Sequence, residues 1–158
     1  DMSLSDILTV LQNSLTLLAA RQGKKLTMEI QMETNLKTDK HYFLLSVFRN
    51  LFTNALEAST GEHVQLGFTE SQQGDLIQFA IRDNGPGIPP EILPSIFQPG
   101  FSTKINFSTG EVNRGLGLNL VEDVVKNQLQ GDIRVESRPG CTTFYIQVPK
   151  TQLEVAPQ

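Results

Sequence analysis

The chain has 158 residues, of which 39% are hydrophobic, so it is long enough to bury the core of one globular domain. Its formal net charge of −4 and isoelectric point near 5.1 argue against general binding to nucleic acids or anionic membranes, because both require a cationic surface. Cys141 is the single cysteine, which excludes an intrachain disulfide and is typical of a reducing compartment. No apolar run approaches the ~20 residues of a membrane helix, so we expect a soluble chain, which could still be one part of a membrane-anchored protein.

The first part of the sequence predicts two amphipathic helices with a strand between them. Apolar residues recur at helical spacing over residues 4–18, and Ser3 with Asp6 resembles a capping box at the start. Apolar and polar residues alternate over residues 26–32, as in a half-buried strand. A second helix is predicted from about residue 39 to residue 59, because its apolar residues form a continuous stripe.

The middle of the sequence predicts a β-hairpin followed by a long loop. Residues 64–68 and 77–81 alternate as strands do, and the turn-like segment 71–75 separates them. A short helical turn is expected over residues 89–95, where prolines stand near its start. Residues 97–114 show no sustained period and predict a loop of a length that is usually functional or disordered.

The last part predicts a third helix and a second hairpin. The helix begins near residue 116 and ends at Gly131, a residue suited to a left-handed C-terminal cap. Residues 133–135 then pair with residues 144–148 across the turn at 138–140.

The order of these elements indicates the fold class. Helices that cover one face of a mixed sheet are the economical arrangement, because each strand has one apolar side and each helix one apolar stripe. The sequence therefore predicts an α+β fold, a two-layer α/β sandwich with a mixed, mainly antiparallel sheet of about five strands covered on one face by about three helices. We expect residues 1–150 to form this domain and residues 151–158 to form a flexible C-terminal tail.

Two glycine pairs stand where the chain needs backbone freedom. Asp83 ends a predicted strand and is followed by Gly85 and Gly87. Gly115 and Gly117 precede the last helix, where unpaired amides and the helix dipole favour a bound anion. Taken singly, each pair is structural more often than functional, and neither matches a P-loop or Rossmann fingerprint.

Two asparagines form a third motif. Asn50 and Asn54 are four residues apart and therefore lie on one face of the second helix. Asparagine is a mediocre helix former, because its side chain competes for backbone hydrogen bonds. The pair is either solvated or supplies a side-chain oxygen to Mg²⁺, a hard ion that bridges nucleotide phosphates.

Four segments in a set order resemble the boxes of the histidine-kinase catalytic domain. RNLFTNALEAS resembles the N box, RDNGPGIP the G1 box, IFQPGFSTK the F box and NRGLGLNL the G2 box. This domain belongs to the ATPase superfamily that histidine kinases share with gyrase B, Hsp90 and MutL, which has the Bergerat-type ATP-binding fold. The resemblance covers nearly the whole chain, and four ordered boxes are far more specific than any single one.

The resemblance implies a protein-histidine kinase that binds ATP with Mg²⁺. The γ-phosphate would pass to a histidine on a separate dimerisation domain and then to a response regulator protein. Asn54 would be the Mg²⁺ ligand, Asn50 would lie beside the phosphates, and Asp83 would accept a hydrogen bond from the exocyclic amine of adenine. Thr142 corresponds to the family's threonine that helps to hold this carboxylate and its water.

Other residues of the boxes complete the implied site. The glycines would turn the chain around the base and cradle the phosphates. The phenylalanines would anchor a mobile lid or pack in the core, and the two cations would face the phosphates or solvent. The implied catalytic residues are Asn50, Asn54 and Lys104, and the implied nucleotide-binding residues are Asn54, Asp83, Gly85, Gly87, Ile88, Phe97, Phe101, Lys104, Arg114, Gly115, Leu116, Gly117, Leu118 and Thr142.

The amide at position 50 helps to choose among the relatives. In the gyrase and Hsp90 branches, a glutamate typically occupies this position and activates water for hydrolysis. An amide cannot remove a proton near neutral pH, so ATP can be kept for transfer to a protein side chain. Stand-alone serine kinases of the superfamily usually keep the glutamate, and they are the alternative together with a non-catalytic ATP-binding scaffold.

Two features bear on the partners. Glu57 stands where many kinases of the family have a lysine that meets the phosphates, so other cations must take that part. Neither His41 nor His63 has the sequence setting of a phospho-accepting histidine, so the acceptor is expected on another domain. We expect a cytoplasmic location, either free or as part of a membrane-anchored sensor, with no nucleic-acid partner and no membrane contact by this domain.

Overall fold

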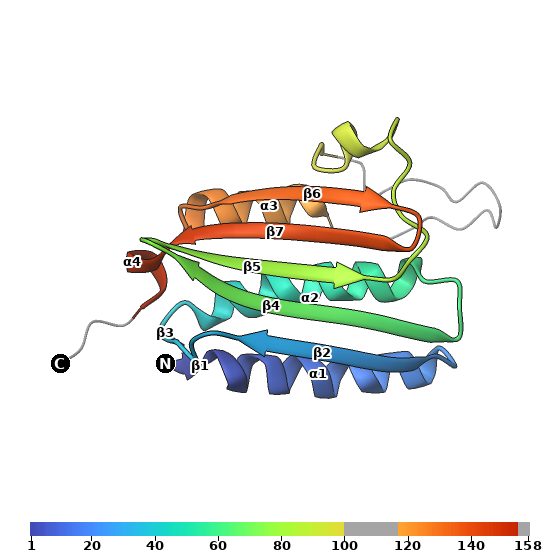
Figure 1. Ribbon diagram of the computed structural model, residues 1–158, viewed down its shortest axis with the longest axis horizontal. Helices are drawn as coiled ribbons and strands as arrows, with labels where there is room; N and C mark the ends of the chain where they lie inside the picture. The colour runs from blue at the N-terminus through green and yellow to red at the C-terminus, as the bar shows by residue number, and fades with distance from the viewer. Residues whose placement is uncertain (100–116, 155–158) are drawn as a thin grey trace.

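Five strands form one sheet, which faces the viewer in Figure 1. The computed structural model describes residues 1–99 and 117–154. The strands are β2 (Lys25–Met32), β4 (His63–Gln73), β5 (Leu76–Asp83), β6 (Asp132–Arg138) and β7 (Cys141–Pro149). Their order is β2-β4-β5-β7-β6, and only the β2–β4 pair is parallel. The predicted mixed, mainly antiparallel sheet is confirmed.

Three helices cover the rear face of the sheet (Figure 1). They are α1 (Leu4–Arg21), α2 (His41–Ala58) and α3 (Leu118–Asp123), which continues as a wider π-helix over Val124–Gln128. The capping box is confirmed in part, since the Ser3 hydroxyl accepts a hydrogen bond from the Asp6 amide at 3.2 Å. Two short strands, β1 (Met2–Ser3) and β3 (Lys37–Thr38), pair with each other beside the main sheet.

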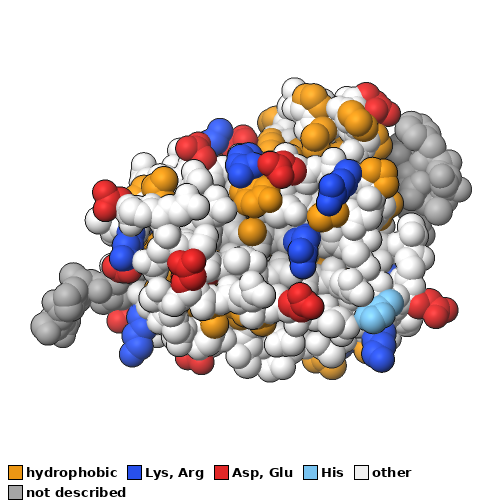
Figure 2. All heavy atoms as spheres, viewed as in Figure 1, with side chains coloured by type: hydrophobic (Ala, Val, Ile, Leu, Met, Phe, Trp, Pro, Cys, Tyr) orange, Lys and Arg blue, Asp and Glu red, His pale blue; other side chains and the backbone are white. Residues whose placement is uncertain are grey.

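The core lies between the sheet and the helices. Phe48 of α2 is fully buried and meets Phe68 of β4 and Phe79 of β5 edge to face, with ring centroids 5.1 Å apart in both pairs. The other face of the sheet is open, and Figure 2 shows hydrophobic and charged side chains only scattered over it. An antiparallel sheet with one packed and one solvated face explains the alternation in the sequence.

Two turns differ from the sequence prediction. The first hairpin turns at residues 74–75 instead of 71–75, because polar residues of β4 continue the strand beyond the core. At the end of the third helix, Gln130 takes the left-handed conformation (φ 55°), so the cap predicted at Gly131 is wrong by one residue. Gly131 is needed for another reason, since a Cβ there would overlap the carbonyl oxygen of Gln147 in β7.

The expected flexible tail is wrong for residues 151–154. Residues Lys150–Leu153 form the short helix α4, and Leu153 is fully buried. Glu154 forms an isolated bridge with Thr38. One apolar side chain in a polar segment therefore fixes the end of the domain, a contact that composition does not predict; residues 155–158 lie outside the described residues.

The segment after β5 contains one turn of 3₁₀-helix, η1 (Leu93–Ser95). It begins later than the turn predicted over residues 89–95, although Ile92 and Leu93 already donate to the Pro89 carbonyl at 2.9 and 3.1 Å. Most of the loop predicted over residues 97–114 lies outside the described residues. In the described part of the chain, no helix is long and apolar enough to cross a membrane.

We predict that Phe48→Ala lowers the free energy of unfolding by ~3–5 kcal/mol, because it leaves a cavity among three packed rings. Tyr42 on the same helix is 77% exposed, so Tyr42→Ala should change stability by less than ~0.5 kcal/mol. Denaturant unfolding followed by circular dichroism measures both. Equal losses in the two variants would contradict this account of the core.

Candidate functional site

The end of β5, the start of β7 and the end of β6 lie side by side, on the right in Figure 1. Asp83 is the last residue of β5 and pairs across the ladder with Thr142 of β7, which in turn pairs with Ser137 of β6. Each of these side chains faces the helix layer, because it continues the buried alternation of its strand. The sheet therefore aligns a carboxylate and two hydroxyls in one row across three strands.

The carboxylate of Asp83 is half-buried and held through one oxygen. Its Oδ1 accepts a hydrogen bond from the Gly85 amide at 2.8 Å. Within the described part of the chain, Oδ2 receives no hydrogen bond. Burial raises the pKa of the Asp83 carboxyl, and the Gly85 hydrogen bond opposes part of this rise. The second oxygen is therefore available to a hydrogen-bond donor on a ligand.

The loop after Asp83 depends on its two glycines. A Cβ at Gly85 would lie 2.8 Å from Asp83 Oδ1, and Gly85 also accepts a hydrogen bond from the Gly140 amide at 3.0 Å. Gly87 has φ +87°, and a Cβ there would lie 2.6 Å from the carbonyl oxygen of Arg138. Gly85 therefore leaves room for the Asp83 carboxylate, and Gly87 lets the loop pack against the β6–β7 turn.

Ser137, which sequence reasoning missed, joins the same loop to β6. Its Oγ accepts a hydrogen bond from the Ile88 amide at 2.8 Å and lies 2.7 Å from Oγ1 of the buried Thr142. A signal for it was present, because a serine in hairpin register with Thr142 must lie on the same face of the sheet.

Asn84, between the aspartate and the first glycine, was also missed. Its Oδ1 accepts from the Gln65 amide at 3.0 Å, and its Nδ2 donates to the His63 carbonyl at 3.4 Å. Asn84 is exposed and extends the β4–β5 pairing by side-chain bonds. It therefore fixes the end of β5, on which the position of Asp83 depends.

Helix α2 contributes the two amides. Asn50 and Asn54 are both half-buried and lie four residues apart on this helix, which contacts β5 and α3. At the end of α2, Lys24 Nζ donates to the carbonyls of Leu56 and Ser59 at 2.8 and 2.9 Å. This lysine places positive charge where the helix dipole favours it.

Glu57, the departure from the family's lysine, lies on the last turn of α2. Burial raises the pKa of its carboxyl, and the charge of nearby Lys24 opposes that rise. In the described chain, no group of three or more His, Cys, Asp or Glu residues could hold a metal ion. Amide oxygens such as those of Asn50 and Asn54 are a kind of ligand that a magnesium ion accepts beside water and phosphate oxygens.

The structure describes only part of the F and G2 boxes. Gly117 is the N-cap of α3, and Leu118 is buried. Phe97 is half-buried with its ring centroid 6.3 Å from that of Phe144, an edge-to-face contact within the core. Five predicted site residues lie outside the described residues: Phe101, Lys104, Arg114, Gly115 and Leu116.

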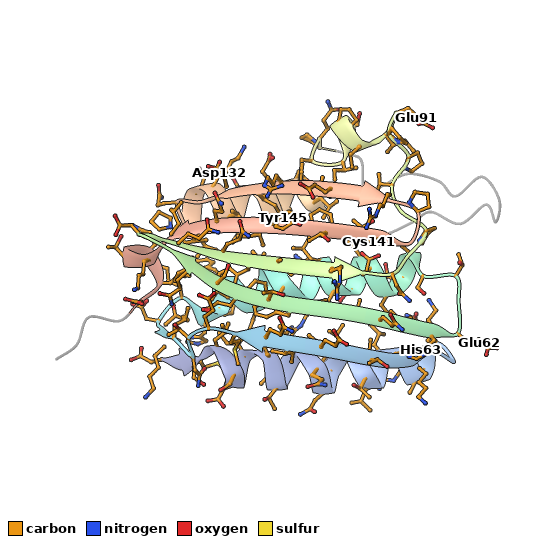
Figure 3. The ribbon with its side chains drawn as sticks, in the orientation of Figure 1. Glu62, His63, Glu91, Asp132, Cys141 and Tyr145 are labelled. Atoms are coloured by element: carbon orange, nitrogen blue, oxygen red, sulfur yellow. The ribbon has the colours of Figure 1, made fainter. Side chains whose placement is uncertain are left out.

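A hollow of about 310 Å³ lies on the open face of the sheet, beside the end of β5. Its lining includes Arg82 and Glu29, whose charged groups are 3.9 Å apart, and Cys141. Figure 3 shows Cys141 at the end of β7 beside the turn. Because Asp83 continues the helix-facing alternation of β5, the thiol and the carboxylate row serve opposite faces of the sheet.

Comparisons with known proteins agree with this geometry. Residues 39–152 match the family described as histidine kinase-, DNA gyrase B-, and HSP90-like ATPase. The sensor histidine kinase GlnK of Bacillus subtilis (strain 168) is 29% identical over 152 residues, which are 96% of this chain and 37% of GlnK. The sensor histidine kinase DcuS of Escherichia coli (strain K12) is 36% identical over 126 residues, which are 78% of this chain and 22% of DcuS.

Solved structures show the same fold. The nucleotide-free catalytic domain of histidine kinase ThkA superposes with a TM-score of 0.74 at 24% identity, covering 94% of this chain and 93% of that domain. ThkA in complex with the response regulator TrrA matches with a TM-score of 0.71 at 23% identity, covering 96% of this chain and 41% of ThkA.

The chain spans about two fifths or less of the curated relatives that it matches, and so corresponds to one domain of such proteins. With most of its length matched by the family and sensor histidine kinases among its relatives, the chain belongs to the histidine kinase-, DNA gyrase B-, and HSP90-like ATPases as a catalytic domain of the histidine-kinase type.

Proposed function

We propose that this domain binds ATP at the end of β5 and transfers its γ-phosphate to a histidine on a separate dimerisation domain. The observation that carries the proposal is the Asp83 carboxylate, half-buried and held by one oxygen while the other has no hydrogen bond within the described residues. A half-buried carboxylate with a raised pKa at a glycine-rich turn is typical of a ligand site.

Adenine fits the chemistry of this carboxylate. The exocyclic amine of the base donates hydrogen bonds, and Oδ2 of Asp83 would accept one while Oδ1 stays on Gly85. A base with a carbonyl at that position would place two acceptors together, so the site would favour adenine over guanine. The loop held by Gly85 and Gly87 would form one wall of the base site.

The phosphates would lie toward α2 and the start of α3. Asn54 is the proposed Mg²⁺ ligand, with Asn50 beside the phosphates; magnesium supplies positive charge to the leaving diphosphate when bound. Gly115, Leu116, Gly117 and Leu118 are proposed for the backbone that cradles the phosphates. Phe97, Phe101, Lys104 and Arg114 are proposed to act in or beside the lid, and Phe97 does so from a position packed on the core.

The amide at position 50 suits transfer rather than hydrolysis. An asparagine side chain cannot act as a general base, so water at this position would not be activated. A neutral imidazole needs no strong base to act as a nucleophile. We therefore propose that the acceptor histidine comes from a dimerisation domain and that a response regulator receives the phosphate.

The named relatives support these partners. They are sensor histidine kinases, and one matching solved structure holds a kinase together with its response regulator. The net charge of −4 supports the absence of a nucleic-acid partner and of membrane contact by this domain. We place the domain in the cytoplasm, free or as part of a longer sensor.

We predict that Asp83→Asn weakens MgATP binding by about ten- to a hundredfold, the usual effect of losing a hydrogen bond to a charged acceptor. The domain should still fold, because the asparagine oxygen can accept from Gly85. Calorimetry measures the affinity. Asp75→Asn, in the exposed turn at the other end of β5, is the matched control and should change nothing. Unchanged affinity in Asp83→Asn would remove Asp83 from the base site.

A pH series gives a second prediction. The raised pKa of Asp83 means that the carboxyl is protonated at a higher pH than an ordinary aspartate, so nucleotide affinity should fall as the pH is lowered through that pKa. Stability should move the other way: the folded state binds this proton more tightly than the unfolded state, so acidification stabilises wild type relative to Asp83→Asn. Calorimetry measures the affinity and thermal unfolding the stability of both proteins over the pH series. The ratio of the two affinities is free of the titration of the ligand, which is the same for both proteins. A wild-type-to-variant affinity ratio independent of pH would contradict the assignment.

Transfer itself is tested by mixing the domain with labelled ATP and a histidine-bearing dimerisation domain of a sensor kinase. We expect label on the acceptor that is lost in acid, as phosphohistidine is, and no label when the acceptor histidine is replaced by glutamine. Acid-stable label would instead support the serine kinase. Tight ATP binding with no label on any of a panel of acceptor domains would support a scaffold.

A further inference from the structure

One hydroxyl outside the four family boxes touches both the base-site loop and Thr142. Ser137 Oγ accepts from the Ile88 amide at 2.8 Å and lies 2.7 Å from Thr142 Oγ1. Thr142 is 4% exposed and Ser137 is half-buried, so water does not easily replace either partner. Ser137 therefore holds the end of the loop farthest from Asp83.

The Ser137 hydroxyl takes part in two hydrogen bonds, one with the Ile88 amide and one with the Thr142 hydroxyl. The Ile88 amide can only donate, so Ser137 Oγ is the acceptor in that bond and keeps its own proton. Ser137 Oγ and Thr142 Oγ1 lie 2.7 Å apart and share one hydrogen bond, in which either hydroxyl can be the donor. Thr142 is the cross-strand partner of Asp83 on β5, so this bond fixes a hydroxyl in the same row as the carboxylate.

The loop has a second attachment near its other end. The Gly140 amide donates to the Gly85 carbonyl at 3.0 Å, and the Gly85 amide donates to Asp83. Gly87, between the two attachments, packs on the Arg138 carbonyl with φ +87°. The two bonds together fix the path of residues 85–88 over the β6–β7 turn, and only the bond at Ser137 depends on a side chain of that turn.

We propose that Ser137 is a positioning residue of the base site: it holds the Ile88 amide and the Thr142 hydroxyl, so that loop 84–88 and the Thr142 side chain are ordered before the nucleotide binds. This inference rests on the proposed ATP-binding function. It predicts that Ser137 acts on affinity for the nucleotide through Thr142 and Ile88, without contact to the phosphates.

Calorimetry of the whole chain with MgADP tests the proposal. Ser137→Ala should weaken binding about tenfold, because it leaves the half-buried Ile88 amide and the buried Thr142 hydroxyl without their partner. Ser137→Thr keeps the hydroxyl and should stay within about threefold of wild type. Ser71→Ala is the matched control: Ser71 is also half-buried on a strand of this sheet, near the far end of β4, and its loss should leave affinity unchanged.

A double-mutant cycle separates positioning from plain stabilisation. If Ser137 acts in part through Thr142, the loss of MgADP affinity in the variant with both Ser137→Ala and Thr142→Ala should be smaller than the product of the two single losses, since coupled residues are not additive. If the two residues contributed independently, the fold losses in affinity of the two single variants would instead multiply in the double variant. Hydrogen exchange of wild type gives a readout that needs no variant: the Ile88 amide should be protected before nucleotide is added.

The outcomes keep the two proposals apart. Absence of MgADP binding by well-folded wild type would overturn the proposed function itself. Wild-type binding with an unchanged Ser137→Ala affinity, or with multiplicative losses in the cycle, would overturn only the positioning role. If Ser137→Ala does not fold, an Ile88 amide that exchanges in wild type as fast as an exposed loop amide overturns it as well.

Discussion

The site depends on the close approach of two backbone segments, the loop after β5 and the turn between β6 and β7. Gly87 packs against the Arg138 carbonyl and the Gly140 amide bonds Gly85, so neither segment can move without the other. This contact decides where the Asp83 carboxylate is held. Because β5 and β7 are neighbouring strands whose apolar residues lie in the core, the packed core holds the strand end that bears the carboxylate.

The strand end of β5 contains residues that lower the stability of the domain. Burial disfavours the charged form of Asp83, and glycine loses more conformational freedom on folding than any other residue. Both effects destabilise the apo domain, and both are concentrated within four residues of the strand end. The aromatic core around Phe48, Phe68 and Phe79 stabilises the domain and offsets this cost, so the strand end can keep residues that suit the proposed binding.

Regular periodicity predicted most of the fold, and single contacts account for what it missed. The three covering helices and the five strands follow from apolar spacing, and Ser3 followed from cap chemistry. Leu153 and Gln130 were missed because one buried leucine or one left-handed residue leaves no pattern in a sequence. In the candidate site, Asp83 was predicted because it stands in a motif, whereas Ser137 was not, since its place beside Thr142 exists only once β6 and β7 pair.

The division between binding and chemistry follows from which groups the chain has. Asp83, Thr142 and the two asparagines of α2 all lie on regular elements, so the proposed recognition of the base and of a metal-bound phosphate would need little rearrangement of the described residues. Proton removal is the one function for which the N box offers no group, since Asn50 is an amide. A domain built in this way favours retention of bound ATP until a nucleophile arrives, and a neutral imidazole on another domain meets that condition without requiring any change in the pocket.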